Sequence, residues 1–354
     1  MPRQISLKKS DSQNVYIGLD VHKKNWSVNI IQGGIQRKSF SQIASVDALV
    51  RYLKKNYPGL NYYSAYEAGF CGFSVHYELW EAGIKNIVFN PADISQKHKE
   101  GARKTDTVDA QKIARNLYNG ELDCVHIPDR GRHSDRSLLR LRQWNLKDFQ
   151  RAKIRLRHFL HVHGIAIPEE FPTISLRFLK WLEDKSSQLP AELGYALRSM
   201  IESLRQKRSQ IRDINCKLVE LMNTHRYKAD YDLLRTIPGI GVITALTILL
   251  ECGDLRDFSS VDKFCAFVGL IPDCAVSGDH ATKSEMTKRR HKTLRYMLIQ
   301  CAWRAIKKDE YLSNVYVKAA TRMNSAKAIV IVANKLAKIV KFVLKNKKGY
   351  EIPK

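Results

Sequence analysis

Four carboxylates in the first third of the chain have the types and spacing that could do chemistry. They are Asp20, Glu67, Asp106 and Asp109, and each lies where a strand is expected to end or a helix to begin. Carboxylate oxygens are good ligands for Mg²⁺ or Mn²⁺, and two such ions about 3.5–4 Å apart can stabilise the attacking and leaving oxygens of a phosphodiester displacement. The four acids therefore predict a metal site for Mg²⁺ or Mn²⁺ and phosphoryl-transfer chemistry.

The local sequence around each acid predicts the element that positions it. Asp20 closes an apolar run, residues 15–19, that is typical of a buried strand. Glu67 follows a second strand-like run, residues 62–66. Thr105 can cap a helix, and the i, i+3 spacing of the last two acids sets them on one face about 5–6 Å apart. Any one acid alone is more often a cap or a solvated charge, but Asp20 stands where open α/β sheets bind ligands, and the combination favours a shared pocket.

The charge balance points to a polyanionic partner. The chain has 354 residues, with 60 Lys and Arg against 35 Asp and Glu, which gives a formal net charge of +25. The excess is uneven, because residues 1–125 carry 17 basic and 12 acidic residues, residues 126–228 carry 21 and 11, and residues 229–354 carry 22 and 12. A basic protein of the membrane surface is the alternative, but no lipidation signal or long apolar segment supports it. Nucleic acid is the expected partner.

Length and cysteine content indicate a reduced protein of two or three domains. No apolar segment typical of a secretory signal follows the first residues, and the seven cysteines form no C-x-x-C pair. We therefore expect a cytoplasmic, prokaryotic protein without a membrane anchor, associated with the nucleoid when it acts.

The order of expected elements in residues 1–125 indicates an α/β domain. Residues 15–40 suggest two or three strands with a hairpin at Gly33 and Gly34, and further elements are expected in the order helix 45–56, strand 62–66, helix 73–82, strand 84–89 and then the helix that carries Asp106. This order, with acids at strand ends, resembles the ribonuclease H-like fold and its RuvC-like branch.

Residues 126–228 predict a helical arm. A long arginine-rich helix is expected at 130–163, with an apolar stripe made of Leu138, Leu141, Phe149, Ala152, Leu156 and Phe159. A second helix is expected at about 195–225, where Arg208 and Asn215 share core-type positions with Ile201, Leu204, Ile211, Leu218 and Met222. The intervening prolines turn the chain around. A coiled coil for dimerisation or RNA contact and a simple intramolecular hairpin explain the pattern equally well.

Residues 229–354 open with a helix-hairpin-helix pattern at 233–245. Gly239 and Gly241 allow the tight turn, and backbone N–H groups at the next helix start can bind a phosphate without reading sequence. The apolar stretch that runs to Leu250 is most simply core. A purely structural turn is the alternative, but the basic surroundings favour nucleic-acid binding. A basic run follows, composed of Lys283, Lys288, Arg289, Arg290, Lys292 and Arg295.

The motifs in their order resemble the DEDD transposases of the insertion-sequence one-ten family, including its eleven-eleven branch. They read YIGLDVHK at 16–23, YEAG at 66–69, KTDTVDA at 104–110, TIPGIG at 236–241, FVGLIP at 267–272 and SG at 277–278. The resemblance covers nearly all of residues 15–340. It implies a RuvC-like catalytic domain (1–125), a helical or coiled-coil arm (126–228) and a mostly helical C-terminal transposase domain (229–354).

The resemblance also implies roles for particular residues and partners. The four acids would bind the metal ions, and Ser277 would be the nucleophile that forms a phosphoserine link to DNA. On spacing alone Ser277 is a loop serine, although Gly278 permits the close approach of a phosphate. The family implies recombination of donor and target DNA directed by a non-coding bridge RNA. Because two DNA partners must be cut and exchanged, we expect a homo-oligomer, a dimer or a tetramer.

The chain departs from the family pattern in the C-terminal domain. Asp279-His280 follows Ser277-Gly278 where a small or basic residue is common, and Arg290-His291 stands where a Gly-Asn pair is common. Ser284 is a second candidate nucleophile. His22, just after Asp20, is assigned to packing or phosphate contact and not to the metal set.

Two other functions are compatible with the same residues. A RuvC-like, structure-specific DNA endonuclease would activate water at the acids and would not need Ser277. A nucleic-acid scaffold would use the acids only structurally and would ignore divalent metal. Replacement of Ser277 by alanine separates the first from a recombinase, and replacement of Asp20 and Asp109 by asparagine separates the second.

Overall fold

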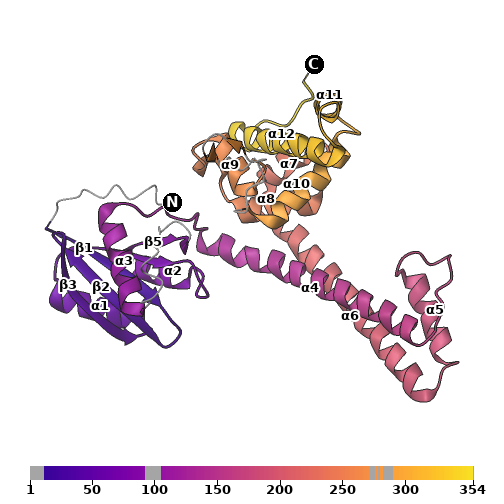
Figure 1. Ribbon diagram of the computed structural model, residues 1–354, viewed down its shortest axis with the longest axis horizontal. Coiled ribbons are helices and arrows are strands. Elements are labelled where there is room, and N and C mark those ends of the chain that lie inside the picture. Colours follow the sequence, from indigo (N-terminus) through magenta and orange to yellow (C-terminus); the bar gives the residue numbers. More distant parts are fainter. Residues whose placement is uncertain (1–11, 92–104, 272–275, 278–279, 282–289, 354) are drawn as a thin grey trace. The chain divides into compact units, whose positions relative to one another are not determined.

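A computed structural model describes residues 12–91, 105–271, 276–277, 280–281 and 290–353 of the chain. The chain divides into two compact units, Met1–Arg130 and Gly131–Lys354. The first is an α/β unit, and the second is mostly helical (Figure 1).

The first unit is built on a five-stranded mixed sheet with the strand order β3-β2-β1-β4-β5. The strands are β1 (Asn14–Val21), β2 (Asn25–Gln32), β3 (Ile35–Ile43), β4 (Asn61–Glu67) and β5 (Lys85–Phe89). β1, β2 and β3 form an antiparallel meander, while β4 and β5 run parallel to β1. Gly33 and Gly34 have φ of 60° and 77°, which the two-residue turn between β2 and β3 requires and which glycine allows.

Helices cover both faces of this sheet. α1 (Val46–Asn56) and α2 (Ser74–Glu81) pack on one face through Leu49, Leu53 and Leu79, against inward-pointing residues of β1 such as Ile17. α3 (Asp106–Asn119) packs on the other face through Ile113, Ala114 and Leu117, beside Tyr16 and Ala65. The predicted element order is confirmed, with ends that differ by one or two residues, because strands buried along most of their length, such as β1 and β5, carry apolar runs.

The second unit consists of helices that form a large main core and a smaller core at the α5 end. They are α4 (Arg130–Val162), α5 (Leu176–Ser186), α6 (Ala191–Met222), α7 (Lys228–Arg235), α8 (Val242–Cys252), the 3₁₀ turn η3 (Leu255–Asp257), α9 (Val261–Val268), α10 (Lys292–Ala305), α11 (Glu310–Ala320) and α12 (Ser325–Asn346). A short hairpin pairs β6 (Val276–Ser277) with β7 (His280–Ala281). Within the described part of the chain, every helix is too short or too polar to cross a membrane.

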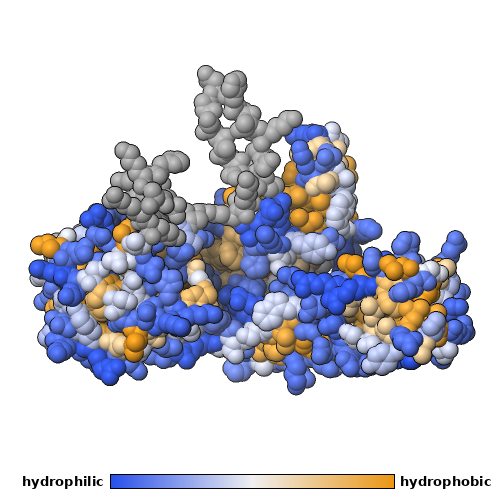
Figure 2. Space-filling model, turned by 60° about the horizontal axis from the view of Figure 1, so that its bottom comes forward, coloured by the Kyte–Doolittle hydropathy of each residue, from blue (hydrophilic) through white to orange (hydrophobic). Residues whose placement is uncertain are grey.

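α4 and α6 form an arm whose core is divided between its two ends. One end, with α5, buries Leu156, Leu160 and Leu204 among others, and the other end joins the main core through Leu139 and Ile214. Of the described residues, none between Leu139 and Leu156 on α4 is fully buried. Leu176 on α5 is 57% exposed and Tyr195 on α6 is 71% exposed. Figure 2 shows hydrophobic surface at the α5 end, on the right.

Several details of the predicted arm are wrong. Leu141, assigned to the apolar stripe of α4, is 41% exposed, and Arg208, assigned to a core-type position on α6, is exposed. Asn215 is half-buried and accepts a hydrogen bond from Arg142 Nε at 2.6 Å. The segment 164–194 does more than turn the chain, because it contains α5. A heptad pattern was expected along the whole helix, but the polar sequence in the middle of α6 interrupts the seam.

Candidate functional site

The site in the first unit begins with a close contact between α3 and β1. Gly18 lies on the face of β1 that α3 covers, and a Cβ atom there would stand 2.1 Å from the carbonyl oxygen of Ala110 and 2.4 Å from the nitrogen of Ala114. The helix backbone therefore rests directly on the strand, which only glycine permits. This contact sets the first turn of α3, with Asp106 and Asp109, close to the end of β1.

The strand register places the remaining acids on the same face of the sheet. β1 and β4 are parallel, with Gly18 opposite Ala65 and Leu19 opposite Tyr66. Because side chains alternate along a strand, Asp20 shares the face of Gly18, and Glu67 shares the face of Ala65. Glu67 ends β4 and follows the last of these pairs, so its backbone lies beside that of Asp20.

Side-chain contacts bring Asp20, Asp106 and His22 together. Nε2 of His22 lies 3.3 Å from Oδ2 of Asp20 and 3.6 Å from Oδ2 of Asp106. One ligand atom from each of these three residues lies within 4.8 Å of the others. Thr105 caps α3 as expected, because its hydroxyl accepts a hydrogen bond from Val108 N at 3.4 Å. The sequence reasoning excluded His22 from this group.

The electrostatics of the acids favour a divalent cation. Partial burial raises the pKa of Asp20; His22 acts in the opposite direction, and the negative charges of Asp106 and Asp109 raise that pKa further. The negative charges around Asp20 are therefore incompletely neutralised, and a bound cation would relieve their repulsion. Carboxylate oxygens and an imidazole nitrogen at these separations fit a divalent metal ion.

The predicted nucleophile lies in the second unit. Ser277 ends β6 and pairs with His280 of β7. Its side chain lies outside the described part of the structure, as do Gly278, Asp279, Lys283, Ser284, Lys288 and Arg289. The chain is held on both sides of this segment, because Leu270 O accepts a hydrogen bond from Asn334 and His291 N donates one to Phe267 O. Arg290, Lys292 and Arg295 stand at the start of α10.

The predicted helix-hairpin-helix corresponds to α7, a turn and α8. Gly239 in the turn has φ of 86°, and a Cβ there would approach Cys301 O to 2.4 Å. Gly241 is the N-cap residue of α8, and Arg235 donates a hydrogen bond to Ile240 O at 2.9 Å. Gly239 therefore has a structural reason of its own, since it lets the turn pack on α10. A role for Gly239 and Gly241 in nucleic-acid binding stays a prediction.

The sequence did not predict a buried charge cluster at the root of the arm, by which we mean the first turns of α4 where they meet α8. Glu251, 7% exposed on α8, has carboxylate oxygens 3.7 Å from Arg136 Nε, 3.9 Å from Arg140 Nε and 3.6 Å from His291 Nε2. Arg136 also donates hydrogen bonds to Leu250 O at 2.5 Å and Glu251 O at 2.7 Å. Burial raises the pKa of Glu251, but the hydrogen bond with His291 and the charge of Arg136 outweigh it and lower the pKa overall. An acid inside the apolar run of α8 was the available signal.

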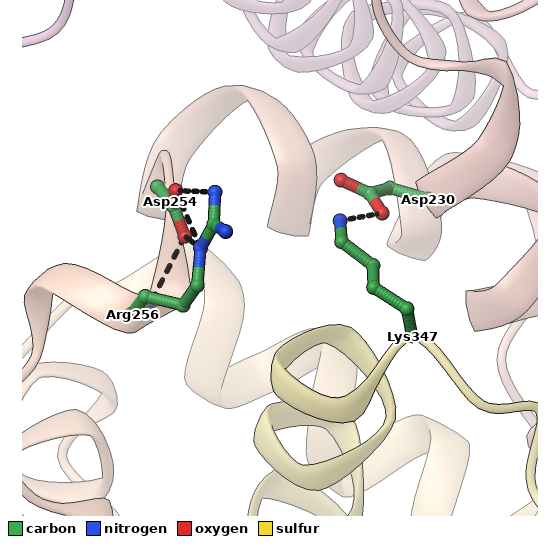
Figure 3. A network of polar contacts seen from close by, with 4 residues as sticks. All are labelled: Asp230, Asp254, Arg256 and Lys347. Carbon is green, nitrogen blue, oxygen red and sulfur yellow. Dashed lines mark hydrogen bonds and ion pairs between the residues drawn. The ribbon is translucent and has the colours of Figure 1, made fainter.

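A second polar cluster surrounds a small cavity of about 150 Å³ near the ends of α8 and α12. Arg256 binds Asp254 through paired contacts of 2.5–3.0 Å, and Lys347 contacts Asp230 (Figure 3). Each of these cations has a carboxylate partner, and Lys347 caps the C-terminus of α12, where a positive charge is favourable. This cluster is explained by the stability of the helix ends.

Comparisons with known proteins agree along most of the chain. Residues 17–164 match the family model of the DEDD transposases of IS110 elements, and residues 231–317 match that of the IS116/IS110/IS902 transposase family. A putative transposase y4qE of Sinorhizobium fredii is 26% identical over 298 residues, which are 83% of this chain and 72% of the relative. The transposase for insertion sequence element IS1111A of Coxiella burnetii is 25% identical over 300 residues, or 79% and 77% of the two chains.

Proposed function

Since the chain belongs to the IS110 family of DEDD transposases, which transfer phosphoryl groups of DNA, we propose that it is an RNA-guided recombinase using four carboxylates and a serine. The transposase activity and the ribonuclease H-like DEDD domain follow from the family. The guide RNA, the metal ligands and the nucleophile are the proposed part.

The observation that carries the proposal is the packing of α3 on β1 at Gly18. That contact supports a shared site for Asp20, Asp106 and Asp109, and the parallel register of β1 and β4 supports adding Glu67 to it. Glu67 and Asp106, which follow Asp20 by 47 and 86 positions in the sequence, thereby become candidates for the same ligand set as Asp20. A divalent ion held there would supply positive charge to the attacking and leaving oxygens of a phosphodiester.

In the proposed reaction Ser277 is the attacking group. Its hydroxyl oxygen forms a bond to the phosphorus, the bond from phosphorus to one DNA oxygen breaks, and that oxygen leaves as a DNA hydroxyl after it takes up the proton. A hydroxyl of the partner strand then attacks the phosphoserine, which rejoins DNA and returns the proton to the serine. No water is consumed, so the energy of the phosphodiester is kept for rejoining.

The binding partners follow from charge and family. Backbone phosphates of DNA are expected at the start of α10, where Lys292 and Arg295 meet a helix N-terminus, and at the turn before α8. Sequence choice is assigned to a non-coding RNA that pairs with donor and target. The arm of α4 and α6 is assigned to self-association, because its middle lacks buried apolar side chains of its own.

A strand-exchange assay on DNA that carries the element's ends tests this function. With the co-purified RNA present, the wild-type chain should yield rejoined junctions and a protein–DNA adduct in Mg²⁺ or Mn²⁺. Ser277→Ala should abolish both products, whereas Ser284→Ala should retain them. Continued cleavage by Ser277→Ala without an adduct would instead identify a water-using endonuclease.

Sequencing of the co-purified RNA tests the guide. A segment that matches both the donor junction and the target is expected. Random cellular RNA in the wild-type complex would contradict RNA guidance.

If Asp20→Asn together with Asp109→Asn left every activity unchanged, the acids would be structural only.

A further inference from the structure

His22 contacts two of the proposed metal ligands, although it follows the motif acid and was assigned to packing or phosphate contact. It follows directly after the end of β1, and its Nε2 atom lies close to the carboxylates of both Asp20 and Asp106. The side chain of His22 is 54% exposed, so burial in a core does not explain its position.

We propose that His22 is a nitrogen ligand of the metal site, and that the site selects a first-row transition ion such as Mn²⁺ over Mg²⁺. The proposal deepens the proposed function and rests on it, because it takes the four acids as the remaining ligand set. It assigns a residue and a metal class that the four carboxylates alone leave open.

The distances between the three side chains match those around one ion. At metal–ligand distances of about 2.1 Å, two neighbouring ligand atoms of an octahedral ion lie about 3 Å apart, and two opposite ones about 4.2 Å apart. The separations of 3.3 and 3.6 Å from His22 Nε2 lie between these values. All three ligand atoms are within 4.8 Å of one another, so shifts of a few tenths of an ångström would suffice.

The chemistry of the donor set decides the class of ion. Mg²⁺ prefers oxygen ligands and near-ideal octahedral geometry, whereas an imidazole nitrogen is a favourable ligand for transition ions. An all-carboxylate site would take either ion, and the added nitrogen shifts the preference toward Mn²⁺ and later ions. Asp106 is 66% exposed and Asp20 is 23% exposed, so one side of the site is open to water and to a phosphate oxygen.

An ordinary ion pair is the competing explanation of the same contacts. A protonated His22 would also approach Asp20 and Asp106, and it would then repel a divalent cation. The two explanations differ in one observable, the presence of a histidine nitrogen in the coordination sphere of the bound ion.

Pulsed electron paramagnetic resonance of Mn²⁺ bound to the full chain tests the proposal directly. The wild-type protein should show a ¹⁴N coupling from one imidazole, and His22→Gln should remove it. Removal of this ligand should weaken Mn²⁺ binding by about tenfold or more, by analogy with the losses seen on disturbing metal sites. The same substitution should change the affinity for Mg²⁺, measured by its competition with Mn²⁺, by less than about threefold. Lys23→Ala, a neighbouring exposed residue, is the matched control and should behave as wild type.

Other outcomes would refute either the role of His22 alone or both that role and the acid site. Bound Mn²⁺ without a ¹⁴N coupling, or a coupling that survives His22→Gln, would refute the role of His22 while leaving the acid site intact. If Asp20→Asn did not weaken Mn²⁺ binding, or if the wild-type chain bound no Mn²⁺, the acid site of the proposed function would fail as well.

Discussion

Two clusters of ionisable side chains, one in each unit, each pair a carboxylate with a histidine, but their balance of negative and positive charge is opposite. At the end of β1, Asp20 and Asp106 both contact His22, and within the described residues no lysine or arginine forms an ion pair with either acid. At the root of the arm, Glu251 alone is surrounded by Arg136, Arg140 and His291. Carboxylates outnumber basic side chains in the first cluster, whereas basic side chains outnumber the single carboxylate in the second.

The pKa values of the half-buried Asp20 and the buried Glu251 reflect this difference. The pKa of Asp20 is raised, by burial and by neighbouring acids, and the pKa of Glu251 is lowered even though burial opposes this. Folding therefore works against the ionised Asp20 and in favour of the ionised Glu251. An acid kept ionised at a cost to stability is suited to binding a cation, while an acid enclosed by arginines holds helices together.

The largest expected effect is the loss of recombination in Asp20→Asn. A metal ion contributes several kcal/mol to the transition state of a phosphoryl transfer, so the loss of a ligand should reduce the rate by about 10³-fold, or roughly 4 kcal/mol. Strand exchange under saturating DNA measures it. The fold should stay intact by circular dichroism. A rate within tenfold of wild type would remove Asp20 from the site.

Glu251→Ala should have the opposite profile, with a large loss of stability. Removal of one partner from a buried ion pair typically costs about 3–5 kcal/mol, because the remaining charges stay buried. Urea unfolding of the full chain measures this loss. The matched control is Asp148→Ala on α4, which breaks an exposed pair with Arg151 and should cost less than about 1 kcal/mol. Equal losses in the two variants would contradict the contrast.

Gly18→Ala should separate the acids without changing any of them. A methyl group 2.1 Å from the Ala110 carbonyl oxygen must push α3 off β1, at a cost of about 1–3 kcal/mol or more. Mn²⁺ binding should weaken with it. Gly69→Ala is the control, since its Cβ would meet nothing closer than 3.7 Å. Unchanged Mn²⁺ affinity in Gly18→Ala would show that the α3 contact does not position the site.

The smallest effect is a pH dependence of opposite sign in the two units. Asp20 has a raised pKa, so its ionisation lowers stability as pH rises from its ordinary value of 3.8 through the raised value. Asp20→Asn should thus be more stable than wild type at pH 7, with the gain vanishing at acidic pH. Glu251 stabilises the fold above 4.5, its ordinary pKa, and this contribution is lost as pH falls below that value.

Unfolding free energies of wild type, Asp20→Asn and Glu251→Gln between pH 3.5 and 7, without divalent metal, measure both effects. Differences of the same sign for the two variants at pH 7 would contradict the comparison.

The α/β unit was predictable because local pattern and tertiary structure agree there. The apolar run before Asp20 predicted β1, Gly33-Gly34 predicted the hairpin and Thr105 predicted the helix cap. The acids were found because each stands at the end of a strand or the start of a helix. The contact between Gly18 and α3 was not foreseen, since a glycine inside a strand does not say which backbone approaches it.

The helical unit was harder to predict because its contacts depend on partners distant in sequence. An apolar stripe on α4 cannot show which side another helix will cover, so Leu141 was assigned wrongly and α5 was missed. Glu251 contacts Arg136, which lies 115 positions earlier in the sequence, and no periodic pattern of residues predicts such a long-range contact. His22 was set aside because sequence spacing does not show the proximity of Asp106.

The central claim is that distant carboxylates of the first unit bind one divalent site. Crystals of the full chain soaked in Mn²⁺ and measured for anomalous scattering test it most directly. We predict a peak within about 2.0–2.3 Å of oxygens from Asp20 and at least one acid of α3. Peaks confined to other surfaces, with Asp20 and Asp106 unligated at saturating Mn²⁺, would contradict the claim.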